Sequence, residues 1–91
     1  MIKAGRKQGT TRFVYRPENG AARVGLAGDF TGWEPVTMKP QKNGTYAVTL
    51  PVTPGAHEYR LIVDDAWITD PDHSHWAPNP FGSYNSVVEV E

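Results

Sequence analysis

Residues 23–33 read Arg-Val-Gly-Leu-Ala-Gly-Asp-Phe-Thr-Gly-Trp and join a strand pattern to a turn pattern. Val24 and Leu26 occupy alternate positions, which is the period of a strand with one buried face. Residues 28–32 are rich in turn formers and lead directly to Trp33. Two interpretations of Trp33 stay open here. Its ring caps the core, because tryptophan is mostly buried on average, or it is a binding residue on a loop of a rigid scaffold.

The same alternation continues through the rest of the chain in short segments. In the longest of these, Tyr59 and Leu61 fall on the face expected to be buried, and Arg60 falls on the opposite face. No window has helical periodicity, and Pro or Gly interrupts the sequence about every ten residues. Short strands at this spacing predict an all-β, single-domain antiparallel β-sandwich. We expect strands at residues 11–16, from about 21, at 35–40 (a short piece), 46–50, 56–64, 67–69 and 85–90.

The composition limits the classes of function. Ninety-one residues make one domain with one compact core. A formal net charge of -1, with both signs mixed along the chain, provides no field for nucleic acid. The absence of cysteine excludes disulfides and a thiolate site. No apolar run approaches the ~20 residues of a membrane span, so we expect no membrane partner and a cytoplasmic location.

Two segments depart from the strand pattern. Residues 1–9, with the basic residues Lys3, Arg6 and Lys7, are expected to be a flexible, solvated leader to a module at residues 10–91. Residues 70–83 form an irregular segment that is longer than most loops of a compact domain. Because this segment contains aromatic residues, we expect a binding loop there and not disorder.

The residues that could carry catalysis or hold a metal give weak signals. Aspartates at turns commonly bond the backbone, and a sandwich of this size offers little cleft for a pair of catalytic acids. The one metal-like cluster contains no cysteine, whereas structural zinc usually has four closed nitrogen or sulfur ligands. We therefore expect no catalytic residue, no metal and no cofactor, and we place His57 at a strand rim. The aspartates considered are Asp29, Asp64, Asp65, Asp70 and Asp72, and the metal-like cluster is Asp70, Asp72, His73 and His75.

Aromatic residues outside the strand pattern give a stronger signal. Phe13, Tyr15, Tyr46 and Tyr59 already meet the demand for core aromatics, so further rings at turns indicate an apolar platform on the surface. These further rings are Trp33, Trp67, Trp76 and Phe81.

An aromatic platform suits a sugar ligand. A pyranose ring has an apolar face that stacks on an aromatic ring, and its hydroxyl rim pairs with planar amide and guanidinium groups. Arg60 and Asn85 lie on the non-core faces of their strands and supply those groups. Two stacked rings at ~1 kcal/mol each predict millimolar to micromolar binding, which suits a polymer with many repeats.

Four blocks in this order resemble the family-48 carbohydrate-binding modules. The blocks are residues 24–33, residues 55–64 (Gly-Ala-His-Glu-Tyr-Arg-Leu-Ile-Val-Asp), Trp67 with Asp70-Pro71, and residues 81–88 (Phe-Gly-Ser-Tyr-Asn-Ser-Val-Val). The family includes the glycogen-binding domain of the AMP-activated protein kinase β subunit and the N-terminal modules of isoamylases and branching enzymes. The resemblance covers about residues 11–91. It implies an immunoglobulin-like (early-set) β-sandwich that binds α-1,4-glucans such as glycogen and starch.

The resemblance also implies which residues bind the sugar. Trp33 and Trp67 match the two stacking tryptophans of the kinase-type modules, and Asn85 matches the hydrogen-bonding asparagine. The remaining positions depart from the family pattern: Arg60 stands for the usual Lys, Phe81 for a Leu that threads a cyclic glucan, and Ser83 for a Thr. The loop with His73, His75 and Trp76 has no counterpart that can be carried over.

Two functions remain open from the sequence. The first is non-catalytic docking of glycogen or a related α-glucan on one sandwich face. The second is a structural or protein-interaction domain that packs on a glycan-metabolising enzyme or kinase partner. Retention of Trp33, Trp67 and Asn85 favours the first.

Overall fold

The computed structural model describes residues 2–5, 8–17, 23–71, 73 and 75–91. Within these residues the chain is all-β apart from one 3-10 turn, η1 (Asp29–Thr31). The strands are β1 (Ile2–Ala4), β2 (Thr10–Tyr15), β3 (Val24–Gly28), β4 (Val36–Thr37), β5 (Lys39–Pro40), β6 (Tyr46–Pro51), β7 (Gly55–Val63), β8 (Ala66–Ile68), β9 (Trp76–Pro78) and β10 (Tyr84–Val90).

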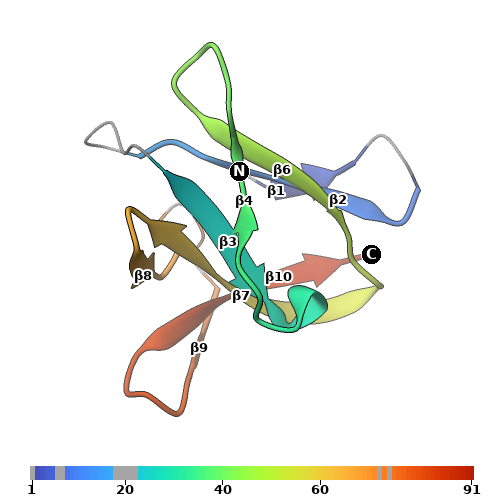
Figure 1. Cartoon of the computed structure of the whole chain (residues 1–91). Coiled ribbons are helices and arrows are strands. Elements are labelled where there is room, and N and C mark those ends of the chain that lie inside the picture. The colour runs from blue at the N-terminus through green and yellow to red at the C-terminus, as the bar shows by residue number, and fades with distance from the viewer. Residues whose placement is uncertain (1, 6–7, 18–22, 72, 74) are drawn as a thin grey trace.

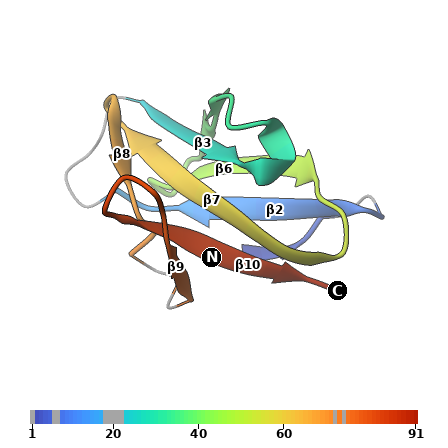
Figure 2. The same ribbon diagram turned by 90° about the horizontal axis from the view of Figure 1, so that it is seen from below.

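The strands form two antiparallel sheets that pack face to face (Figures 1 and 2). One sheet has the order β1-β2-β6-β5. The other has the order β4-β3-β7-β10-β9, with β8 paired to the end of β7. This arrangement confirms the predicted immunoglobulin-like β-sandwich.

The core lies between the sheets and is built from alternate residues of the long strands. On β7, Tyr59 and Leu61 are buried, while Arg60 between them lies on the opposite face, as the pattern predicted. Complete burial of one such apolar side chain stabilises the fold by roughly 1.5–3 kcal/mol. The buried hydrophobic cluster is Phe13, Tyr15, Val24, Leu26, Met38, Val52, Tyr59, Leu61 and Val88.

One buried polar group ties the loop after β8 to the core. The Tyr59 hydroxyl donates to Oδ2 of Asp70 at 2.7 Å, and the Asp70 backbone N–H donates to Oγ of Ser86 at 2.9 Å. Buried polar groups need such partners, because burial without hydrogen bonds costs several kcal/mol. Asp70 is therefore a structural residue that links β7, the loop and β10.

The prediction of an irregular segment at residues 70–83 is wrong in its middle. Strand β9 lies there and pairs with β10 through Ala77↔Asn85 and its two neighbours, so residues 79–83 become a hairpin loop. The sequence pattern missed β9 because the strand is short and ends on Pro78. Proline is tolerated in β9 because it is an edge strand.

The N-terminal segment contributes a strand as well. Within the expected leader, β1 pairs with β2 from Ile2↔Phe13 to Ala4↔Thr11. The module boundary at residue 10 stays a prediction. Arg6, Lys7, the strand start near residue 21 and Asp72 lie outside the described residues.

The turn after β3 requires glycine at position 28, because there is no room for a side chain there. A Cβ there would lie 2.7 Å from the Phe30 ring and 2.8 Å from the backbone oxygen of Glu58. The Gly28 oxygen accepts the N–H of Trp33 at 2.9 Å, and Gly32 and Trp33 follow in left-handed conformation with φ of 64° and 61°. Close approach to β7 at Gly28 thus fixes where the Trp33 backbone leaves the sheet.

We expect Gly28→Ala to lower the free energy of unfolding by about 1–3 kcal/mol, because the added methyl overpacks the turn. The backbone of Gly28 is extended, with φ -158°, so the loss would come from the clash and not from backbone strain. Urea unfolding measures the change. Thr37→Ala, at an exposed position of the neighbouring strand β4, is the control. A Gly28→Ala protein as stable as the control would contradict the account of the turn.

Candidate functional site

The outer face of the six-stranded sheet carries a cavity of about 570 Å³. Its walls come from the turn after η1, from β7, from β8, and from the β9–β10 hairpin. In Figure 1 this hairpin extends beyond the end of β7, beside β8. The residues that line the cavity are Asp29, Trp33, Glu58, Arg60, Trp67, Asn79, Pro80, Phe81 and Asn85.

Five of the six site residues expected from the sequence therefore lie together: Trp33, Arg60, Trp67, Phe81 and Asn85. The sixth, Ser83, lies at the base of the hairpin and is not among the lining residues. Its backbone N–H donates to Oδ1 of Asn79 at 3.1 Å, and its backbone oxygen accepts the N–H of Asn79 at 2.9 Å.

The aromatic side chains of the cavity are exposed. Trp33 keeps 39%, Trp67 43% and Phe81 92% of its surface accessible. These values exclude the interpretation of Trp33 as a cap buried in the core. Both indoles line one cavity, so they lie on the same side of the sandwich.

Trp76 is exposed but belongs to the other face of the sheet. Its register partner on β10 is Ser86, which is fully buried on the core side. Paired residues project to the same face of a sheet. The Trp76 ring packs against Tyr84, with centroids 6.2 Å apart, and contributes nothing to the cavity.

The polar floor of the cavity is held by hydrogen bonds within the protein. Nη2 of Arg60 donates to the backbone oxygen of Trp67 at 3.0 Å. Nδ2 of Asn85 donates to Oε1 of Glu58 at 3.0 Å, and Oδ1 of Asn85 accepts from Nδ2 of Asn79 at 3.2 Å. Among the described side chains, Nε of Arg60 is the one buried nitrogen or oxygen without a partner.

The hairpin that carries Phe81 is fixed by Asn79, a residue that the sequence analysis did not single out. Oδ1 of Asn79 accepts the N–H groups of Phe81 at 3.0 Å and of Ser83 at 3.1 Å. Asparagine favours such turns because its side chain bonds the backbone two residues further along. Its position between Pro78 and Pro80 was the available signal.

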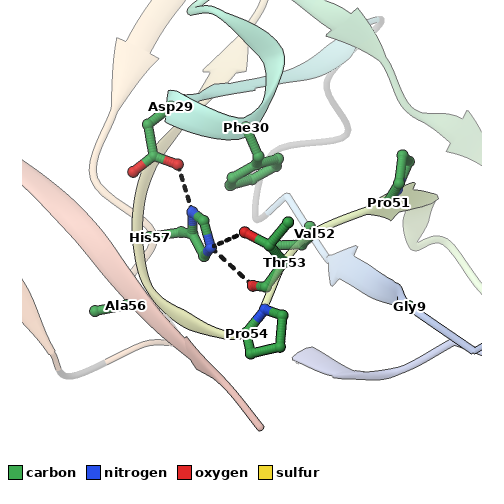
Figure 3. Close-up of a pocket in the computed structure, with 9 residues that line it drawn as sticks. All are labelled: Gly9, Asp29, Phe30, Pro51, Val52, Thr53, Pro54, Ala56 and His57. Carbon is green, nitrogen blue, oxygen red and sulfur yellow. Dashed lines mark hydrogen bonds and ion pairs between the residues drawn. The ribbon is translucent and has the colours of Figure 1, made fainter.

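A second cavity, of about 610 Å³, lies beside η1 and is shown in Figure 3. His57, which the sequence analysis expected at a strand rim, lies in the wall of this cavity. Nδ1 of His57 is 2.7 Å from Oδ1 of Asp29, and Nε2 is 2.8 Å from the backbone oxygen and 3.2 Å from Oγ1 of Thr53. Oδ2 of Asp29 accepts the N–H of Glu58 at 2.9 Å. Asp29 lines both cavities.

This environment raises the pKa of His57 above its ordinary value of about 6.5. The main cause is the hydrogen bond with the Asp29 side chain. Burial of the imidazole acts in the opposite direction, while the Thr53 backbone oxygen and the charge of Asp29 raise the pKa further.

Asp64, Asp70 and His73 have structural contacts. The Asp64 carboxylate accepts the backbone N–H of Arg23, 41 positions away, at 2.9 Å. The His73 ring bonds the backbone oxygen of Val87, and Asp70 bonds Tyr59. In the described part of the chain, no three His, Cys, Asp or Glu side chains come together as a metal site.

Comparisons with known proteins bear on this geometry. A sequence profile described as the glycogen recognition site of AMP-activated protein kinase matches residues 10–91. The 5'-AMP-activated protein kinase subunit beta-1 of Sus scrofa is 28% identical over 78 residues, which cover 86% of this chain and 62% of that protein. Protein PTST homolog 2, chloroplastic, of Arabidopsis thaliana is 41% identical over 54 residues, which cover 58% of this chain and 10% of that protein.

A solved structure shares the fold. A Salmonella typhimurium protein described as an alpha amylase superposes with a TM-score of 0.72 at 21% identity, over 96% of this chain and 14% of that one. The chain thus spans less than two thirds of the length of each relative. No helix among the described residues has the length and hydropathy needed to cross a membrane.

We expect Asn79→Ala to loosen the hairpin that carries Phe81. Loss of the shared acceptor, at about 1 kcal/mol for each hydrogen bond, would accelerate amide exchange of Phe81 and Ser83 about fivefold or more. Hydrogen exchange followed by NMR measures the effect. Pro80→Ala, which removes no hydrogen bond, is the control. Unchanged exchange in Asn79→Ala would contradict the role given to Asn79.

Proposed function

The chain belongs to the family described as the glycogen recognition site of AMP-activated protein kinase, and on this premise we propose where and how it docks a glucan. The module is a non-catalytic glucan-binding domain. Its docking surface is the outer face of the six-stranded sheet, and its ligand is a glycogen- or starch-type α-1,4-glucan. The observation that carries the proposal is the convergence of Trp33, Trp67 and Arg60 in one exposed cavity.

The two indoles provide the stacking surface. Trp33 and Trp67 leave the sheet from separate elements, so each can receive the apolar face of a different glucose unit. An α-1,4-linked chain curves, and two rings on one concave surface suit that curvature. A flat β-linked chain would meet one ring at a time. The expected discrimination is therefore geometric, since each ring alone stacks on either sugar.

Polar groups beneath the rings fix the register of the chain. The guanidinium of Arg60 spends one N–H on the Trp67 backbone oxygen and has further N–H donors for a glucose hydroxyl. Asn85 already contacts Glu58 and Asn79, which leaves one amide hydrogen and one oxygen lone pair for the sugar. Phe81 adds an exposed ring at the cavity edge. A contact from Ser83 stays a prediction.

Binding by this site is expected to be weak for one short chain. Two stacked rings and a few exposed hydrogen bonds correspond to a dissociation constant in the millimolar to micromolar range, by order of magnitude. Glycogen and starch present many chains, and tethering to a larger assembly would add avidity.

A second candidate is an interaction domain that packs on an enzyme partner. The observation that favours it is the similarity to a protein named as a kinase subunit, of which this chain covers 62%. The two functions are compatible if different faces are used. The expected cytoplasmic location stays a prediction, because another relative is named as chloroplastic.

We expect Trp33→Ala and Trp67→Ala each to weaken binding of maltoheptaose about five- to tenfold, the loss of one stacked ring. Trp76→Ala is the matched control, since its ring lies on the other face of the sheet. Isothermal titration calorimetry at millimolar ligand measures all three. Cellohexaose, a β-linked chain, should bind more weakly than maltoheptaose.

Two outcomes would count against the proposal. Absence of saturable binding to the unmodified protein would favour the interaction-domain function. If Trp76→Ala lost as much affinity for maltoheptaose as Trp33→Ala, the sugar would contact the face of the sheet opposite the cavity.

A further inference from the structure

The turn that presents Trp33 is clamped to β7 by a single carboxylate. Asp29 is the first residue of η1, and its two oxygens contact two neighbours on β7. Oδ1 faces Nδ1 of His57 at 2.7 Å (Figure 3). Oδ2 accepts the N–H of Glu58 at 2.9 Å. The clamp therefore joins the end of β3 to the strand that carries Arg60.

The hydrogen-bond partners of His57 favour its protonated form. The oxygen opposite Nδ1 belongs to a carboxylate, and the nearest oxygen opposite Nε2 is the carbonyl of Thr53 at 2.8 Å. Both oxygens only accept hydrogen bonds. A neutral ring donates to only one of them, and its other nitrogen could then accept only from the Thr53 hydroxyl, whose oxygen is 3.2 Å from Nε2. The imidazolium, with two N–H donors, satisfies both.

Trp33 follows the clamped residue within one closed turn. The Gly32 N–H donates to the backbone oxygen of Asp29 at 3.4 Å, and the Trp33 N–H donates to the backbone oxygen of Gly28 at 2.9 Å. Phe30, between them, stacks on Phe13 with centroids 5.4 Å apart. The half-buried Phe30 thus holds one side of the turn against the core, and Asp29 attaches the other side to β7.

We propose that His57 is a positioning residue for glucan docking: its imidazolium, acting through Asp29, holds the η1 turn against β7 so that the Trp33 ring stays in the docking cavity. The inference rests on the proposed function, because it assigns a consequence for binding. Its structural part, the coupling of His57 to Trp33, exists without a ligand and can be tested without one.

The surroundings of His57 determine the direction of the pH dependence. The ring faces Asp29 and the edge of Phe30 from η1, Thr53 from the loop before β7, and its register partner Val88 from β10. In the part of the chain that the structure describes, Asp29 is the one charged side chain in contact with the ring. Nearby Glu58 directs its carboxylate to Asn85.

The clamp is strongest at low pH, where an imidazolium faces Asp29. It weakens at high pH, where a neutral ring can still donate Nδ1–H to Asp29 and the bond from the Glu58 N–H remains. Because the folded protein raises the pKa of His57, the contribution of the clamp to stability is fully present below the unfolded value of about 6.5. The part of this contribution that comes from the charge of the imidazolium disappears as the pH rises through the folded value. Docking should weaken over the same interval.

The first experiment follows the free protein by NMR between pH 5 and 9. We expect the indole N–H of Trp33, assigned from Trp33→Phe, to shift with the same midpoint as the His57 imidazole, above about 6.5. The indole of Trp76 should not follow this midpoint. A Trp33 resonance that ignores the titration of His57, or a His57 midpoint below the ordinary value, would overturn the inference.

The second experiment measures maltoheptaose affinity at pH 6 and pH 9. We expect the affinity of the unmodified protein to fall about three- to tenfold, a coupling of ordinary size for a residue outside the contact surface. In His57→Asn the amide nitrogen replaces Nδ1 as a donor to Asp29 without titrating. This variant should have, at both pH values, the affinity that the unmodified protein has at pH 9, because its donor is neutral. His57→Ala, which lacks a donor to Asp29, should bind more weakly still at both pH values.

The control is His75→Asn, the same substitution at an exposed histidine, which should reproduce the unmodified profile. A flat profile in the unmodified protein, or a profile that persists in His57→Asn, would contradict the positioning role. Failure of the proposed function has a different signature: no saturable binding at either pH, while the free-protein titration still couples Trp33 to His57.

Discussion

The alternation of side chains along β7 is the constraint on which the rest of the structure depends. Tyr59 and Leu61 point into the core and fix the strand between the two sheets. Successive residues of a strand must face opposite ways, so Glu58 and Arg60 are directed to the outer face. The core therefore determines where the polar floor of the cavity lies. A slip of one residue in this strand would exchange the two sets.

The exposed rings are held by a small number of hydrogen bonds at the strand ends. The Trp33 turn relies on Gly28 for close approach and on Asp29 for attachment to β7. The Phe81 hairpin relies on Asn79. Each device lets a large apolar side chain remain in solvent at a fixed place. Loops on rigid scaffolds commonly carry binding residues in this way.

The sequence predicted the features that depend on local periodicity. The faces of β7 and β10, and hence the outward positions of Arg60 and Asn85, followed from alternation alone. Features that depend on long-range pairing were not predictable. Strand β9 was missed because it has only three residues and ends on Pro78, a residue that disfavours strand prediction. Nothing in the order of residues brings Asp29 to His57, 28 positions away. The face of the sheet on which Trp76 lies could be assigned only from the pairing of β9 with β10, which places Trp76 opposite Ser86.

The most direct test of the account is a crystal structure of the protein with maltoheptaose. The account predicts glucose units stacked on both Trp33 and Trp67, with the Arg60 guanidinium within hydrogen-bond distance of a hydroxyl and Trp76 free of sugar. A glucan bound elsewhere, or one that contacts only one of the two indoles, would contradict it.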